Sequence, residues 1–144
     1  MLFDVNAMDG DNEVSADVCI VGAGAAGIAL AKELVGSHLR VCLLESGGFD
    51  PEPELQDLNR GSIQGRYYYD LRAGRMRAFG GTTNLWSGWS RPLDPIDFEA
   101  RPFVPHSGWP ITYDELLPFY QRAQEVLQLG DFAYAGHQYA EGIP

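Results

Sequence analysis

Two short apolar runs with a helix-like segment between them dominate the hydrophobic pattern of the first 45 residues. Residues 17–22 (DVCIVG) and 40–45 (RVCLLE) have the length and the Val, Ile and Leu content of strands buried on both faces of a parallel sheet. Residues 28–35 are rich in Ala and Leu, and Gly36 follows them, which predicts a helix that ends there. The order of strand, glycine turn, helix and strand predicts a Rossmann-like βαβ unit of an α/β fold.

The hydrophobic pattern on either side of this unit is irregular. Residues 1–15 are polar and acidic, and we expect them to form a flexible arm. Residues 46–65 show no hydrophobic period and contain several glycines and prolines, which predicts a long excursion with a short helix near residues 55–58. Residues 92–111 contain five prolines, so we expect an extended chain with turns there.

A helical pattern returns near the end of the chain. Thr112 and Glu115 have the spacing of a capping box, and the apolar positions that follow fit one helical face. Residues 112–129 therefore predict a structural helix with a stop at Gly130. Pro118 predicts either the start of this helix or a kink in it.

Composition and charge narrow the classes of protein. The 144 residues contain 10 Lys and Arg against 20 Asp and Glu, and a net charge of −10 argues against nucleic-acid binding. A hydrophobic content of 45% argues against disorder, and no apolar run approaches the roughly 18 residues of a membrane span. The N-terminus lacks the features of a secretory signal, so we expect a cytoplasmic protein. Cys19 and Cys42 are interpreted as small buried side chains.

The turn after the first predicted strand carries the motif Gly22-x-Gly24-x-x-Gly27. In this context the first glycine permits the tight turn, the second lets backbone approach a pyrophosphate, and the third allows the helix to pack on the sheet. The N-terminus of the helix attracts the phosphates. Glu45, at the end of the second strand, is suited to accept hydrogen bonds from a ribose diol and disfavours a 2′-phosphate. The alternative is a tight turn without a ligand.

A second glycine segment indicates which dinucleotide binds. Gly80-Gly-Thr-Thr-Asn84 can bring backbone N–H groups against a flat ring or a phosphate, while its side chains bond the polar edge of the ring. The arginines before it are expected to reach the pyrophosphate; they are Arg72, Arg75 and Arg77. Residues 60–91 contain six arginines and one acid, which indicates either an anionic ligand or ordinary surface ion pairs. The second glycine segment favours FAD over NAD.

Five segments together resemble a known family. They are residues 18–27 (VCIVGAGAAG), 43–48 (LLESGG), 80–86 (GGTTNLW), 107–111 (SGWPI) and 113–120 (YDELLPFY). This combination resembles the glucose–methanol–choline (GMC) family of FAD-dependent oxidoreductases, in the branch of pyranose oxidases and sugar or polyol dehydrogenases.

The resemblance implies a role for most of the chain. Residues 16–144 would be the incomplete N-terminal portion of the FAD-binding domain in a larger two-domain flavoprotein, without its catalytic and substrate-binding portion. The family oxidises a CH–OH group by hydride transfer to flavin N5. The implied FAD-binding residues are Gly22, Gly24, Ala25, Ala26, Gly27, Glu45, Ser46, Arg75, Gly80, Gly81, Thr82, Thr83, Asn84, Leu85 and Trp86. Some relatives bond the flavin through a histidine where this chain has Leu85, so we expect non-covalent FAD.

The expected partner is a small alcohol or sugar, while no motif specifies the electron acceptor or the oligomeric state. Two alternatives compete: a truncated, non-catalytic flavin-binding or interaction module, and an NAD-dependent dehydrogenase domain, which the second glycine segment disfavours.

The remaining candidate residues carry less chemistry. The histidines, His38, His106 and His137, match no catalytic motif, and we expect His38 to be solvated. Trp86 is interpreted as either a cavity or a core residue, and Trp89 as a core residue.

Overall fold

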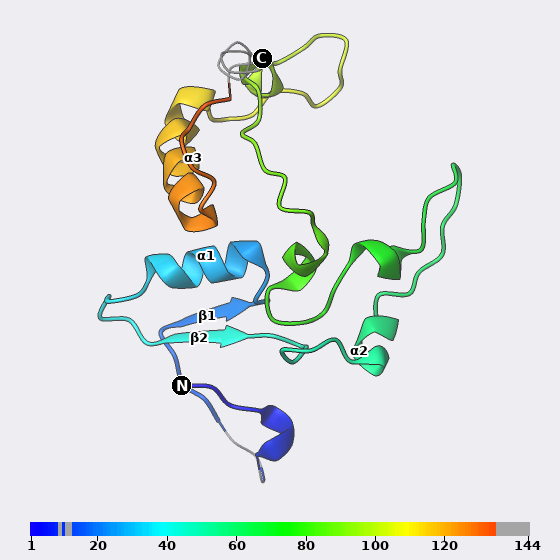
Figure 1. Cartoon of the computed structure of the whole chain (residues 1–144), viewed down its shortest axis with the longest axis vertical. Coiled ribbons are helices and arrows are strands. Elements are labelled where there is room, and N and C mark those ends of the chain that lie inside the picture. Colours follow the sequence, from blue (N-terminus) through cyan, green and yellow to red (C-terminus); the bar gives the residue numbers. More distant parts are fainter. Residues whose placement is uncertain (9, 11–12, 135–144) are drawn as a thin grey trace, which may run out of the picture. The chain divides into compact units, whose positions relative to one another are not determined.

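The chain forms two compact units. The structure is a computed structural model of the 144-residue chain and describes residues 1–8, 10 and 13–134. Residues 1–87 form the first unit, and the second begins at residue 88 (Figure 1). Residues 135–144, which include His137, lie outside the described residues.

The first unit contains the predicted βαβ arrangement. Strand β1 (Val18–Val21) pairs in parallel with strand β2 (Val41–Leu44), with the two strands in full register. Helix α1 (Ala25–Glu33) connects them and lies along one face of this two-stranded sheet (Figure 1). The helix begins three residues earlier than the sequence pattern predicted, directly after the second glycine of the motif, so the glycine turn is shorter than expected.

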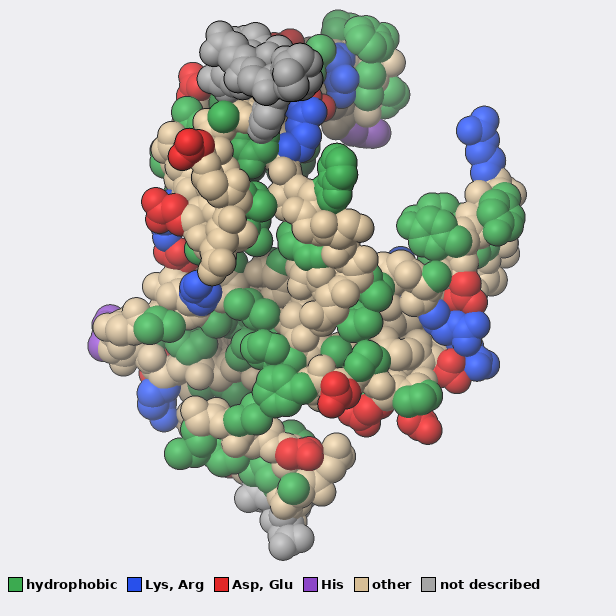
Figure 2. Space-filling view, in the orientation of Figure 1, with side chains coloured by type: hydrophobic (Ala, Val, Ile, Leu, Met, Phe, Trp, Pro, Cys, Tyr) green, Lys and Arg blue, Asp and Glu red, His purple; other side chains and the backbone are tan. Residues whose placement is uncertain are grey.

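Only one face of the sheet is covered within the described part of the unit. Ile20 is 7% exposed, and a Cβ atom on Gly27 of α1 would lie 3.4 Å from its Cγ2 atom. Val21 and Cys19 point the other way and are exposed, and Cys42 is half-buried. The prediction of strands buried on both faces is therefore wrong for the described residues, as is the prediction of two buried cysteines. Figure 2 shows hydrophobic side chains on the visible surface.

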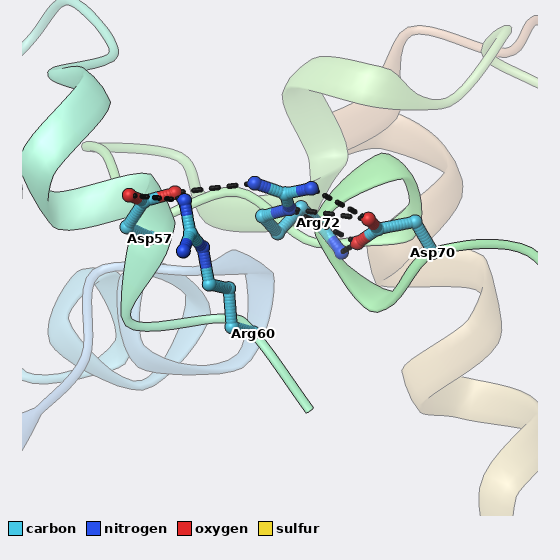
Figure 3. A network of polar contacts seen from close by, with 4 residues as sticks. All are labelled: Asp57, Arg60, Asp70 and Arg72. Atoms are coloured by element: carbon cyan, nitrogen blue, oxygen red, sulfur yellow. Dashed lines mark hydrogen bonds and ion pairs between the residues drawn. The ribbon is translucent and has the colours of Figure 1, made fainter. Parts of the chain in front are cut away.

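The excursion after β2 contains two short helical turns. Helix α2 (Pro53–Asp57) lies where the sequence predicted a short helix, and the 3-10 helix η2 (Leu71–Gly74) follows later. A network of ion pairs joins them (Figure 3). Arg72 lies 3.2 Å from Asp57 and 2.7 Å from Asp70, while Arg60 lies 2.8 Å from Asp57. Arg72 lowers the pKa of Asp70 to about 2, although each exposed pair contributes little to stability.

The N-terminal arm contains one short ordered turn. The 3-10 helix η1 (Val5–Ala7) is capped by the carboxylate of Asp4, which accepts a hydrogen bond from the backbone N–H of Asn6. After the arm, Asp17 forms an ion pair of 3.0 Å with Arg40 and so joins the beginnings of the two strands.

The second unit is built around helix α3 (Tyr113–Leu127). Thr112 caps it through the predicted capping box, so the helix begins before Pro118, which lies in its interior. The helix ends at Gln128, which adopts a left-handed conformation with φ of +55°, two residues before the predicted stop. Among the described residues, no helix combines the length and the apolar character needed to cross a membrane.

Aromatic side chains form the core of this unit. Phe98, in the 3-10 helix η4 (Pro95–Phe98), is 8% exposed, and its ring centroid lies 6.1 Å from those of both Trp109 and Tyr113. Trp89 is 89% exposed, so its assignment to the core is wrong within the described chain.

The capping box gives a test of the helix boundary. The backbone N–H of Thr112 donates to the Glu115 carboxylate over 2.7 Å, and this bond, followed by that from the Thr112 hydroxyl, lowers the pKa of Glu115. We expect Thr112→Ala to lower the free energy of unfolding by about 1 kcal/mol because the first turn of α3 loses its cap. Glu115→Gln is the matched control and should retain most of the stability, since an amide oxygen can accept the same bond. Chemical denaturation followed by circular dichroism measures the free energy of unfolding of both variants. Equal losses of this free energy in the two variants would show that the cap is unimportant.

Candidate functional site

The glycine motif forms a turn that side chains would block. Gly22 has φ of +98°, a left-handed conformation that favours glycine, and its N–H donates to Leu44 O over 2.7 Å. A Cβ atom on Gly27 would lie 1.9 Å from the Gly22 carbonyl oxygen, so helix and turn can pack only with glycine there. At Gly24 a Cβ atom would meet nothing within 4 Å. The space beside Gly24 is therefore open to a ligand.

The N-terminus of α1 faces this open space without a side-chain cap. Gly24 is its N-cap residue and provides no side-chain hydrogen bond, and Ala25 and Ala26 in the first turn are exposed. Uncapped N–H groups and the positive end of the helix dipole attract anions such as a pyrophosphate. The predicted phosphate-binding function of this turn fits its geometry.

The second glycine segment lies directly against the first. The N–H of Gly80 donates to the carbonyl of Ala23 over 2.8 Å, and Gly24 and Gly80 form an isolated parallel bridge. A Cβ atom on Gly81 would lie 3.0 Å from the Cα atom of Gly24. The structure thus brings together the two segments that were predicted to share one ligand.

The polar side chains of the second segment serve mainly the loop itself. It forms the 3-10 helix η3 (Gly81–Leu85), where the Thr83 hydroxyl donates to Gly80 O and the Asn84 amide donates to Phe79 O over 2.9 Å. The Thr82 hydroxyl accepts a long bond of 3.4 Å from the backbone of Met76. The Thr83 oxygen can still accept a hydrogen bond and the Asn84 amino group still has a second hydrogen to donate, so their contact with a flat ring stays a prediction. The backbone turn at Gly80, with φ of +93°, uses one hydrogen of each side chain.

Leu85 and Trp86 follow this loop and are 44% and 46% exposed. Trp86 is therefore not a core residue of the described unit. Both side chains can contact a ligand that extends along the loop.

A third glycine pair packs against the second segment. A Cβ atom on Gly47 would lie 2.4 Å from the carbonyl oxygen of Arg77, and the N–H of Phe79 donates to Gly48 O over 2.9 Å. The loop after β2 and the chain leading to Gly80 therefore touch through their backbones. The sequence contained the signal, a glycine pair directly after a strand, but its packing partner lies some thirty residues further along the chain.

Glu45 links the end of β2 to the glycine turn. Its Oε2 atom accepts a hydrogen bond of 2.7 Å from the N–H of Ala23, and Oε1 accepts bonds from the N–H groups of Ser46 and Gly47. Partial burial raises the pKa of Glu45, but the N–H donors of Ala23, Gly47 and Ser46 outweigh it and hold the pKa below its ordinary value. The carboxylate is therefore ionised at neutral pH, as a ribose acceptor needs to be.

The three arginines expected at the pyrophosphate have different environments. Arg72 belongs to the ion-pair network of Figure 3, and Arg77 bonds the side chains of Asn59 and Ser46. Arg75 is exposed and has no hydrogen bond or ion pair with any residue that the structure describes. Of the three, only Arg75 offers an uncommitted guanidinium, which corrects the prediction for Arg72 and Arg77.

Sequence reasoning missed two residues that shape the site. The side-chain amide of Gln56 pairs with the backbone of Arg77, donating to its carbonyl over 2.7 Å and accepting from its N–H over 3.0 Å. Asn59 accepts from the Arg77 guanidinium over 3.2 Å. Both come from the excursion, which has no hydrophobic period that could have placed them.

An open glycine turn, an uncapped helix N-terminus and an ionised carboxylate at the end of β2 lie together here, an arrangement suited to a dinucleotide. A model of the FAD-dependent oxidoreductase (DAO) family matches residues 17–135. The chain belongs to this family. FAD is therefore the cofactor, as expected, and the alternative of an NAD-dependent dehydrogenase domain is not supported.

Two curated relatives of this FAD-dependent oxidoreductase chain come from Streptomyces. The 6‴-hydroxyparomomycin C oxidase of Streptomyces lividus is 30% identical over 120 residues, covering 73% of this chain and 21% of the relative. The paromamine 6′-oxidase of Streptomyces fradiae is 32% identical over 116 residues, covering 72% of this chain and 21% of the relative. The chain thus spans about a fifth of the length of these relatives. No solved structure matches it significantly.

The second and third glycines of the motif separate cofactor binding from folding. We expect Gly27→Ala to prevent the packing of α1 on the turn, because the new methyl would meet the Gly22 carbonyl. Gly24→Ala meets open space and should leave the fold intact, but it should weaken FAD binding by at least about tenfold by keeping phosphate from the backbone. Thermal unfolding and FAD titration of the two variants check this. Equal FAD affinity of Gly24→Ala and wild type would contradict the role given to Gly24.

The lowered pKa of Glu45 predicts a pH dependence of stability. A carboxylate whose folded pKa is depressed contributes stability that is present above the ordinary pKa of 4.5 and is lost as the pH falls through the folded value. Relative to Glu45→Gln, the wild type should therefore be more stable near neutral pH, and the difference should shrink in acid. Melting temperatures of both proteins across acidic pH measure it, and a difference independent of pH would contradict the prediction.

Proposed function

We propose that this chain forms the FAD cradle of a GMC-type oxidoreductase that oxidises a CH–OH group of a sugar, polyol or related alcohol. The observation that carries the proposal is the direct contact of the two glycine segments at the N-terminus of α1, beside the carboxylate of Glu45. This supports a ligand that is long enough to follow both segments, as FAD is.

Each part of this cradle would contact a different portion of the cofactor. The backbone from Gly24 to Gly27 and the free guanidinium of Arg75 would hold the pyrophosphate, because both attract negative charge. Glu45 and the adjacent Ser46 would hold the adenosine ribose. The loop from Gly80 to Trp86 would lie along the ribityl and isoalloxazine portions, where its exposed apolar side chains can cover the ring.

When bound, FAD would supply the redox chemistry, as the acceptor of a hydride from the alcohol carbon. The residues of this chain bind and orient the cofactor. No histidine lies among the described residues that form the cradle, so we assign no proton acceptor to it.

The substrate class rests on the relatives. Both are named as oxidases of aminoglycosides, and one name specifies the 6′ position of paromamine. We extend to this chain only the general class of substrate, a hydroxylated, sugar-like molecule. The remainder of the FAD domain and the substrate site would come from the rest of a protein of the relatives' length.

The flavin spectrum of the full-length protein tests this function. We expect a visible flavin spectrum that is bleached anaerobically by a sugar or aminoglycoside and not by the analogue lacking the oxidised hydroxyl. Acid precipitation should release all flavin into the supernatant, because position 85 is leucine. A protein without flavin would contradict the cradle, flavin retained in the pellet would contradict non-covalent binding, and bound flavin that no alcohol reduces would favour a non-catalytic module.

A further inference from the structure

Hydrogen bonds link the side chains of Arg77, Ser46 and Glu45 in a chain. The Arg77 Nη1 atom lies 3.2 Å from Ser46 Oγ, which lies 3.3 Å from Glu45 Oε1. We propose that Arg77 is a positioning residue that acts through Ser46 to occupy Glu45 Oε1, so that Oε2 alone reads one hydroxyl of the adenosine ribose. This inference rests on the proposed placement of that ribose at Glu45.

The direction of the two hydrogen bonds is fixed by their donors. A guanidinium can only donate, so the Ser46 oxygen accepts from Arg77. The single hydroxyl hydrogen of Ser46 is then left for the carboxylate of Glu45. The relay therefore runs one way, from Arg77 through Ser46 to Glu45.

The two oxygens of Glu45 differ in what they can still accept. Oε1 receives three donors, namely the N–H groups of Ser46 and Gly47 at 2.9 and 3.0 Å and the Ser46 hydroxyl. Oε2 receives one, the N–H of Ala23 at 2.7 Å. Oε1 thus already accepts three hydrogen bonds, more than its two lone pairs, and has no room for a fourth donor, whereas Oε2 has one position left. A ribose diol would thus place one hydroxyl on Oε2 and find no acceptor at Oε1.

Arg77 is held from both sides, as a positioning residue requires. Gln56 bonds its backbone N–H and carbonyl, and Asn59 Oδ1 accepts from its Nε atom over 3.2 Å. Asn59 is only 9% exposed, and its Nδ2 atom is buried without a partner among the described residues. A buried amide with an unmet donor costs stability, and the one side-chain bond that Asn59 makes among the described residues is the one that holds the guanidinium.

Competition binding with adenosine diphosphates tests the relay. The apoprotein of the full-length chain is titrated with FAD, and ADP, 2′-deoxy-ADP and 3′-deoxy-ADP compete for the site, followed through flavin fluorescence. In the wild type we expect the loss of one hydroxyl to weaken competition at least about tenfold and the loss of the other to change it by less than about threefold. Ser46→Ala removes the third donor from Oε1, and Arg77→Met frees the Ser46 hydroxyl to turn away. In each variant the second ribose hydroxyl should therefore find an acceptor at Oε1, and its loss should weaken competition by about tenfold as well. The double variant should change the ratios no more than either single one.

The ratio of affinities separates this role from a structural one. A variant that merely loosens the loop weakens ADP and deoxy-ADP alike and leaves their ratio unchanged. Arg72→Met is the matched control, because Arg72 pairs with Asp57 and Asp70 and should keep the wild-type ratio. If Arg77→Met does not fold, Ser46→Ala alone decides, since it breaks the relay and leaves the anchors of Arg77 in place.

Three outcomes would overturn the inference. A wild-type ratio that persists in Ser46→Ala and Arg77→Met would show that the relay does not orient Glu45. Equal sensitivity of the wild type to both deoxy analogues would show that Oε1 is not saturated. A wild type that is insensitive to both would show that Glu45 does not bind the ribose, so the proposed cradle itself would be wrong at this point.

Discussion

The close approach of backbone to backbone at three glycines is the constraint on which the first unit depends. Gly27 packs on the Gly22 carbonyl, Gly47 on the Arg77 carbonyl and Gly81 on the Cα atom of Gly24. At each contact a methyl group would meet a backbone atom at 3.0 Å or less, so the neighbouring backbone would have to move. Glycine is therefore required at each point where these three loops meet.

Glu45 connects these packed loops to the proposed cofactor-binding site. Its carboxylate accepts N–H groups from the glycine turn on one oxygen and from the loop after β2 on the other, so a single side chain joins two of the three loops. The N–H donors that lower its pKa also fix its orientation. Under the proposed placement of the ribose, binding and folding are coupled here, because the same carboxylate is also part of the structure of the turn.

The arginines before the second glycine segment have different partners in the structure. The arginine-rich segment suggested either a ligand or surface pairs. Arg72 belongs to the ion pairs with Asp57 and Asp70, and Arg77 is bonded within the loops, whereas Arg75 has no partner among the described residues and is the arginine that we propose for the pyrophosphate. Membership in the FAD-dependent oxidoreductase family agrees with this arrangement, since a flavin dinucleotide carries its negative charge at the pyrophosphate.

The sequence by itself determined the βαβ unit, the capping box of α3, the glycine turn and the acid at the end of β2. Each of these depends on residues close together in the chain, where periodicity and spacing dictate the conformation. Only the tertiary structure decided that Gln56 and Asn59 hold Arg77, that Thr83 and Asn84 bond their own loop, and that Cys19 and Trp89 are exposed. The pairing of donors with acceptors and the burial of each strand face depend on segments that come into contact only after folding. No local sequence pattern encodes those contacts.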